Sequence, residues 1–139
     1  MKIITLKKNN AHLLNNIAKE VFDHKIDLSS LESFLECPRH IMLLAVEDDL
    51  VIGMVSAVEY FHPDKSSQLW INEIGVTSNQ QNKKIGRQLI NQVIELGKKR
   101  GCKYAWLGTD VDNFNAQRCF ASVPNGTKPE RFLLYEWKM

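Results

Sequence analysis

Hydrophobic positions change from a helical to a strand-like spacing near residue 40. The stretch Lys2–Leu6 predicts a short strand, and Asn9 or Asn10 can then cap a helix. The apolar residues of that helix follow helical spacing: Leu13, Leu14, Ile17, Ala18, Val21 and Phe22. A second short helix is predicted over Ser30–Cys37, where Pro38 stops it.

From Ile41 onward the pattern is typical of strands. The runs Ile41–Val46 and Val51–Val58 are rich in β-forming residues, and residues 47–50 between them predict a hairpin. A third run, Leu69–Val76, follows a loop at residues 61–64. Gly75, near the end of this run, indicates a bulge or a close approach by another backbone.

The strongest periodic pattern predicts a helix over Lys84–Arg100. One stripe of it is apolar: Ile85, Leu89, Ile90, Val93, Ile94 and Gly97. Its last turn is basic, and Gly101 suits a left-handed cap. After it we expect a strand over Tyr104–Thr109, a short helix capped by Asp112 or Asn113 and ending at Phe120, and a final strand over Phe132–Trp137.

These elements give the order β-α-α-β-β-β-α-β-α-β. The predicted fold class is therefore α/β, with a mixed, mostly antiparallel sheet flanked by helices. The strand–helix–strand unit over Leu69–Thr109 favours a right-handed crossover. With 139 residues and no repeat or linker, the chain is expected to form a single domain over residues 1–139.

Composition argues against several kinds of partner and ligand. The net charge of +2 is too small to argue for nucleic acid or an anionic membrane as a partner. Neither a spanning apolar stretch nor a signal peptide is recognisable, and three cysteines without a spacing pattern predict free thiols, so a cytoplasmic location is expected. The four histidines lack ligand spacing, and no metal site is expected.

The chemistry is concentrated between residues 69 and 90, where a strand, a polar turn and a helix follow one another. Such a junction points unpaired N–H groups and the positive end of a helix dipole at one spot, which favours a phosphate. Gly86 would let an anion approach the main chain, and Lys83, Lys84 and Arg87 add positive charge. Junctions of this kind also occur without any ligand, so the local pattern alone leaves both interpretations open.

The segment Gln81–Gly86 resembles the pyrophosphate loop of the GNAT family of N-acetyltransferases, written (Arg/Gln)-x-x-Gly-x-(Gly/Ala). Glu73–Val76 is similar to the bulged strand that precedes this loop, and Asn113-x-x-Ala116-x-x-x-Phe120 is similar to the family's Asn-x-x-Ala-x-x-x-Tyr helix. Residues 108–113 and 132–137 look most like the small aminoglycoside 3-N-acetyltransferase-like branch.

The resemblance implies that acetyl-CoA is the co-substrate and that its acetyl group moves directly to a primary amine, with a small molecule favoured. Backbone groups of Ile74 and Val76 would pair with the pantetheine arm, and Asn113 would contact the arm or simply cap its helix. The cofactor-binding residues that it implies are Ile74, Gly75, Val76, Gln81, Asn82, Lys83, Lys84, Ile85, Gly86, Arg87, Asn113, Ala116 and Phe120.

Glu73 is the predicted catalytic base, because the attacking amine must lose a proton before it can react. Strand alternation predicts that Glu73 shares a face with Ile71 and Gly75, where a carboxylate among apolar neighbours is costly unless it is paired or functional. The alternative is a carboxylate that merely attracts a cationic substrate.

Two positions depart from the family's pattern. Phe120 stands where the family has the tyrosine proposed to protonate the leaving thiolate, so Tyr135 becomes a candidate for that role beside simple packing. Lys84 stands in place of the first loop glycine, either as an extra phosphate contact or as a solvated lysine.

Acidic residues indicate where the amine substrate would bind. Asp110 and Asp112 are expected to bind substrate, joined by Asp27, Glu32 and Glu36 if the first helices line the cleft, and an acidic mouth suits an aminoglycoside or a polyamine. The alternatives are an acyl-CoA-binding module with weak or no catalysis, which Phe120 favours, and a protein or peptide N-acetyltransferase. Nucleic-acid binding is disfavoured because no aromatic residues are interleaved with the basic ones. The final strand could pair across a homodimer.

Overall fold

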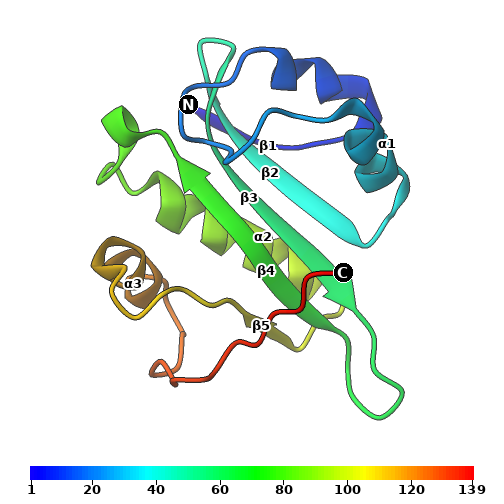
Figure 1. Ribbon diagram of the computed structural model, residues 1–139, viewed down its shortest axis with the longest axis vertical. Coiled ribbons are helices and arrows are strands. Elements are labelled where there is room, and N and C mark those ends of the chain that lie inside the picture. The colour runs from blue at the N-terminus through cyan, green and yellow to red at the C-terminus, as the bar shows by residue number, and fades with distance from the viewer.

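The centre of the molecule is a five-stranded sheet in the order β1-β2-β3-β4-β5 (Figure 1). The computed structural model describes residues 1–139. The strands are β1 Lys2–Thr5, β2 His40–Glu47, β3 Leu50–Tyr60, β4 Gln68–Val76 and β5 Tyr104–Trp106. All neighbouring pairs are antiparallel except β4 and β5, which are parallel. The predicted α/β class and mixed, mostly antiparallel sheet are confirmed.

Helices cover both faces of this sheet. They are the 3-10 helices η1 Lys8–Asn15 and η2 Ser78–Gln80 and the α-helices α1 Leu28–Glu36, α2 Ile85–Lys99 and α3 Phe114–Ala121. In Figure 1, α2 crosses behind the sheet, and α3 lies apart at the lower left. None of the helices combines the length and the apolar character needed to cross a membrane.

The sheet separates two apolar layers. Leu43, Val55 and Leu69 pack with Leu89 and Val93 of α2 in one layer. Leu44 and Met54 pack with Leu6, Leu14 and Val21 of the N-terminal segment in the other. Each fully buried side chain of this size stabilises the fold by about 1.5–3 kcal/mol relative to exposure, so α2 and the N-terminal segment are both held by burial.

The β2–β3 hairpin forms as predicted. Asp48 and Asp49 connect the two strands with φ values of 49° and 61°. Two successive residues in this left-handed region make the tight turn that suits the twist of a hairpin, and aspartate tolerates the conformation better than most residues.

The predicted first helix is wrong beyond Asn15. After η1 the chain extends beside the start of β3, where the Val51 N–H donates to the Asn16 carbonyl and the Ala18 N–H donates to the Val51 carbonyl, both at 2.9 Å. Ile17 thereby forms a parallel bridge with Val51. These hydrogen bonds replace the backbone hydrogen bonds that a continued helix would make. Val21 is nevertheless buried in the extended segment.

The predicted bulge exists, but at Asn72 instead of Gly75. Ala57 of β3 pairs with Ile71 and the adjacent Ser56 pairs with Glu73, which leaves Asn72 without a partner. An extra residue shifts every later side chain to the other face. Ile71 therefore lies in the α2 layer and Glu73 lies on the opposite face with Gly75, so the predicted shared face of Glu73 and Ile71 is wrong.

Gly75 is explained by close approach of another backbone. A Cβ at this position would lie 2.1 Å from the carbonyl oxygen of Val21. The N-terminal segment therefore crosses β4 in direct contact with the main chain of Gly75, as the second of the two interpretations of this glycine predicted.

The predicted final strand over Phe132–Trp137 is wrong, and β5 ends at Trp106 instead of Thr109. No backbone hydrogen bond joins residues 132–137 to any part of the chain. Residues of high β-propensity form a strand only where a partner edge pairs with them, and here they remain unpaired.

We predict that Gly75→Ala lowers the free energy of unfolding by at least the roughly 1–3 kcal/mol typical of overpacking, because its methyl group would overlap the Val21 carbonyl. Chemical denaturation measures this change. The matched control is Gly126→Ala, whose methyl group would meet its nearest neighbour at 3.7 Å. Equal stability of the two variants would contradict the proposed contact.

Candidate functional site

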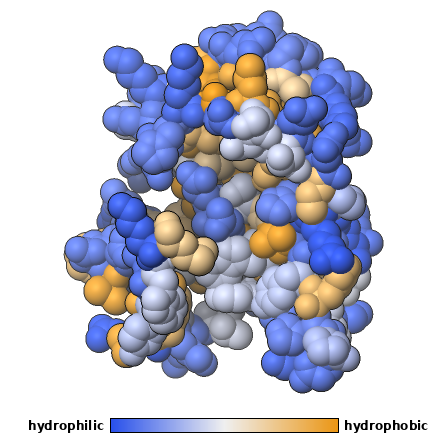
Figure 2. Space-filling view, turned by 45° about the vertical axis from the view of Figure 1, so that its right-hand side comes forward, coloured by the Kyte–Doolittle hydropathy of each residue, from blue (hydrophilic) through white to orange (hydrophobic).

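A cleft opens where β4 extends beyond β5. The two strands pair only from Gln68 to Trp70, so the β4 edge from Ile71 to Val76 has no neighbouring strand on that side. A cavity of about 540 Å³ lies there between β4, the start of α2 and α3, and the surface is hollowed on the α3 side in Figure 2. This volume is typical of small-molecule sites. The lining residues are Ile74, Val76, Gln80, Gln81, Asn82, Lys84, Ile85, Gly86, Arg87, Asn113, Asn115, Ala116, Arg118, Cys119, Phe120 and Ser122.

The floor of the cleft is a row of free backbone donors. The six successive N–H groups of residues 82–87 donate no hydrogen bond within the protein. They surround the N-terminus of α2, where the helix dipole is positive. Asn82 and Lys84 have left-handed φ values of 62° and 65°, a conformation that helps to turn neighbouring N–H groups toward one anion. This is the geometry of a phosphate site.

Lys84, at the start of α2, has a strained backbone conformation. It is the N-cap of α2, and its left-handed backbone costs a non-glycine residue about 1–2 kcal/mol. Glycine would adopt this conformation without strain, which accounts physically for a glycine at this place in related loops. Lys84 adopts this left-handed conformation in spite of the strain and adds its own charge to the lining.

Gly86 allows α3 to pack against α2. A Cβ at Gly86 would lie 3.0 Å from the Cys119 Sγ. Burial raises the pKa of the Cys119 thiol, so the thiol stays protonated near neutral pH and is a poor nucleophile. The cleft therefore contains no activated cysteine.

Helix α3 forms one wall of the cavity, and Asn113 caps its N-terminus. The Asn113 Oδ1 accepts a hydrogen bond from the Ala116 N–H at 3.1 Å, so the capping role predicted for Asn113 is confirmed. Asn115, Arg118, Cys119 and Ser122 also line the cavity although the sequence reasoning missed them. Their spacing of three, one and three residues places them on one helix face, and this periodicity is the signal that could have found them.

Most of the predicted cofactor-binding residues line the cavity, and two do not. Gly75 faces Val21 on the other side of the sheet. The Lys83 Nζ donates instead to the Gln80 Oε1 at 2.8 Å. Nearby, the Gln81 Nε2 donates to the Val76 carbonyl at 3.2 Å, which closes the loop onto the end of β4.

Glu73 lies half-buried on the opposite face of β4. Burial raises its pKa above the ordinary glutamate value, the charge of Asp23 raises it further, and His24 opposes the shift. Ser56, its partner across β3 and β4, is buried and its Oγ has no hydrogen-bond partner within the protein. Asp23 and His24 had no sequence signal, because only the crossing of the chain over Gly75 brings them close to Glu73.

Aromatic rings continue this face away from Glu73. Trp70 lies on the same face of β4 and packs against Trp106 of β5, with ring centroids 3.9 Å apart. The Trp106 Nε1 donates to the Tyr60 hydroxyl at 2.9 Å. Carboxylates beside aromatic faces are chemically suited to cations.

Three predicted residues lie outside the cavity lining. Tyr135 is exposed and stacks on Trp137, with centroids 6.3 Å apart. The carbonyl oxygens of Asp110 and Asp112 accept hydrogen bonds from the N–H groups of Asn113 and Phe114, so both residues shape the turn before α3. Their predicted roles in catalysis and substrate binding gain no support from these positions.

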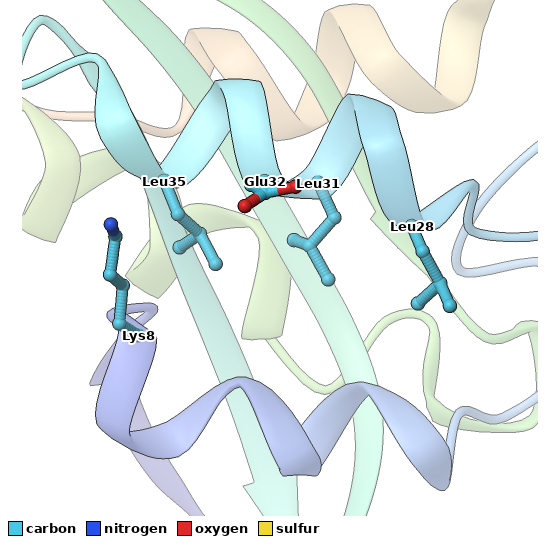
Figure 3. Close-up of a pocket in the computed structure, with 5 residues that line it drawn as sticks. All are labelled: Lys8, Leu28, Leu31, Glu32 and Leu35. Carbon is cyan, nitrogen blue, oxygen red and sulfur yellow. The ribbon is translucent and has the colours of Figure 1, made fainter.

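The acidic residues of the first helices also lie elsewhere. Asp27 is the N-cap of α1, and hydrogen bonds from Ser29 and Ser30 lower its pKa to about 2. Glu32 lines a separate hollow of about 360 Å³ between η1 and α1, into which Leu31 and Leu35 point (Figure 3). Glu36 pairs with Lys8.

We predict that Lys84→Gly is more stable to unfolding than Lys84→Ala by about 1 kcal/mol, because only glycine adopts the left-handed conformation without strain. Both variants lack the ammonium group, so the difference between their free energies of unfolding reports only the backbone strain at residue 84. Thermal and urea unfolding measure it, and equal stabilities would show that the loop does not hold this conformation.

Comparison with known proteins identifies the family. The sequence profile of the acetyltransferase (GNAT) family matches residues 11–123. No curated protein sequence matches the chain.

Three solved structures share the fold at low sequence identity. The aminoglycoside acetyltransferase meta-AAC0020 from an uncultured soil metagenomic sample, in complex with trehalose, is 17% identical with a TM-score of 0.86, over 99% of this chain and 95% of that one. AAC(6')-Iy in complex with the bisubstrate analog CoA-S-monomethyl-acetylneamine is 20% identical with a TM-score of 0.81, over 99% and 98%. A transcriptional regulator from Bacillus halodurans C-125 is 18% identical with a TM-score of 0.74, over 97% and 100%. Because the family profile spans most of the chain and the fold agrees, the protein is an N-acetyltransferase that belongs to the acetyltransferase (GNAT) family.

Proposed function

We propose that the protein transfers the acetyl group of acetyl-CoA directly to a primary amine of a small polycation such as an aminoglycoside or a polyamine. The row of free N–H groups at residues 82–87 is the observation that carries the proposal. The same strand that leads into this row holds Glu73 on its other face, so a phosphate site and a base are joined by one element.

The residues of the cleft fit acetyl-CoA. The N–H groups of residues 82–87 would donate to the diphosphate, with Lys84 and Arg87 beside them. The free edge of β4 at Ile74 and Val76 offers backbone groups to the amides of the pantetheine arm, and Ala116 and Phe120 form the opposite wall. When bound, acetyl-CoA supplies a thioester carbonyl to which an amine can add.

Glu73 would remove the proton of the attacking amine. Burial and the charge of Asp23 raise the pKa of Glu73, which makes its carboxylate a stronger base than an ordinary glutamate. The buried Ser56 hydroxyl beside it would orient the carboxylate or a bridging water. One proton passes from the ammonium to Glu73, the nitrogen bonds to the acetyl carbon, and its second proton passes to water. The carbon–sulfur bond breaks, and its electron pair leaves on the sulfur.

In this proposal neither Phe120 nor Tyr135 donates a proton to the departing sulfur. Phe120 lines the cleft without a proton to give, and Tyr135 lies outside the cavity lining. Thiols have pKa values near 8.5, so a thiolate is stable enough to leave unprotonated. Direct departure of the thiolate is therefore part of the proposal.

The acceptor would bind on the Glu73 face. Asp23 and Glu73 provide two carboxylates, and Trp70 and Trp106 provide aromatic faces that attract cations. A molecule with several amines satisfies both features, and the bisubstrate analog bound to AAC(6')-Iy supports this choice. The resemblance to a 3-N-acetyltransferase branch gains no support, since that similar structure is a 6' enzyme. The proposal therefore names the amine class and leaves its ring position open.

One specific observation favours a second candidate, an acyl-CoA-binding module. Phe120 removes the usual proton donor from a cleft that is otherwise complete. Such a module would bind acetyl-CoA in calorimetry and release no free thiol with any amine.

The test of the proposed function follows free-thiol release from acetyl-CoA across a panel of aminoglycosides, polyamines and peptides with free N-termini or lysines. We expect release with the polycations and not with the peptides, and a roughly 10²–10⁴-fold lower kcat for Glu73→Gln with little change in KM. Glu32→Gln in the separate hollow is the control. A raised KM at unchanged kcat would make Glu73 an attracting charge, and activity confined to peptides would sink the small-molecule assignment.

A pH prediction follows from the neighbours of Glu73. The base must be ionised, so kcat/KM rises with pH through the raised pKa of Glu73. Asp23→Asn removes a charge that raises this pKa, and the acidic limb should therefore move to lower pH. Asp64→Asn, which alters an exposed aspartate paired with His62, should leave the profile in place. An unmoved limb in Asp23→Asn would contradict the coupling.

A further inference from the structure

Three cations line the cleft, and no carboxylate lines it with them. The cations are Lys84, Arg87 and Arg118, and none of the 16 lining residues is an aspartate or a glutamate. None of the three makes an ion pair within the protein. Unpaired cations around one cavity create a positive potential that attracts an anion of several charges. The cleft therefore suits a ligand that carries more charge than a single phosphate.

The three cations belong to two walls of the cleft. Lys84 and Arg87 lie at the start of α2, beside the row of free N–H groups. Arg118 is the charged residue of α3, which has no other. The helix contacts the start of α2, because a Cβ at Gly86 would lie 3.0 Å from the Sγ of Cys119, the residue that follows Arg118. Arg118 is thus close to the N–H row but on a different wall.

Helix α3 presents an apolar stripe and a polar stripe to the cleft. Ala116 and Phe120 form the apolar stripe, and Phe120 packs against the α2 layer. Asn115, Arg118 and Ser122 follow one another at helical spacing and form the polar stripe. The Asn115 Oδ1 accepts a hydrogen bond from the Arg118 Nη2, which holds the guanidinium along this stripe. An apolar surface beside a cationic one matches a ligand that has an apolar arm and an anionic head.

We propose that Arg118 binds the 3′-phosphate on the ribose of CoA and so distinguishes CoA from dephospho-CoA, which lacks that group. The inference rests on the proposed function, in which the N–H row, Lys84 and Arg87 bind the diphosphate. The two charges of a diphosphate within CoA are matched by those two cations, which leaves the charge of Arg118 for another anion. A phosphate monoester carries a charge of about −1.5 to −2 near neutral pH, and a planar guanidinium can donate two parallel hydrogen bonds to it.

Calorimetric titration of the full chain with CoA and with dephospho-CoA tests the proposal. We expect the wild-type protein to bind CoA at least about tenfold more tightly than dephospho-CoA at physiological salt, because a charge-assisted contact is lost with the phosphate. Arg118→Gln should bind CoA about tenfold more weakly than the wild type and dephospho-CoA equally well. The matched control is Lys99→Gln, which removes the same charge from an exposed, unpaired cation at the far end of α2 and should keep the preference for CoA.

The pair of coenzymes separates this inference from the proposed function. Equal affinity of the wild-type protein for the two coenzymes overturns the inference and leaves the proposed function standing, whereas a wild-type protein that binds neither overturns both. An Arg118→Gln variant that is weakened equally toward both coenzymes also overturns the inference, because Arg118 would then contact the diphosphate or support the fold of α3. Loss of the preference in Lys99→Gln would do the same, since the effect would then come from net charge.

Discussion

The extra residue at Asn72 determines where each later side chain of β4 lies. Without it, Glu73 would face α2 with Ile71, and Ile74 and Val76 would face away from the cleft. With it, one strand holds a carboxylate on the face crossed by the N-terminal segment and turns apolar side chains and a free edge to the cleft on the α2 and α3 side. The two halves of the proposed site are thus separated by the thickness of a single strand, and the arrangement of both depends on the bulge.

Much of the fold could be predicted because its signals are local. The apolar stripe of α2, the β2–β3 hairpin and the cap of α3 all depend on residues close together in the chain, and each was recognised. The lining around residues 81–87 followed from the same local pattern, since a helix N-terminus exposes its own N–H groups whatever surrounds it.

Features that depend on distant partners could not be predicted. The bulge at Asn72 is defined by its register with Ser56 and Ala57, and the end of the first helix is defined by hydrogen bonds with Val51. Asp23 and His24 come close to Glu73 only through tertiary packing. The segment Phe132–Trp137 has strand-forming residues, but no residue within it specifies which edge it pairs with. Local propensity thus identifies what an element can be, and long-range contacts decide what it becomes.

Burial of Cys119 has a consequence for the chemical durability of the cleft. A coenzyme that an oxidant has already converted to its disulfide can exchange with a nearby cysteine to give a mixed disulfide and one free coenzyme thiol, and the attacking species is the cysteine thiolate. Because burial raises the pKa of Cys119, its thiolate fraction is small. The packing of α3 onto Gly86, which shapes one wall, therefore also protects that wall from disulfide exchange with oxidised coenzyme.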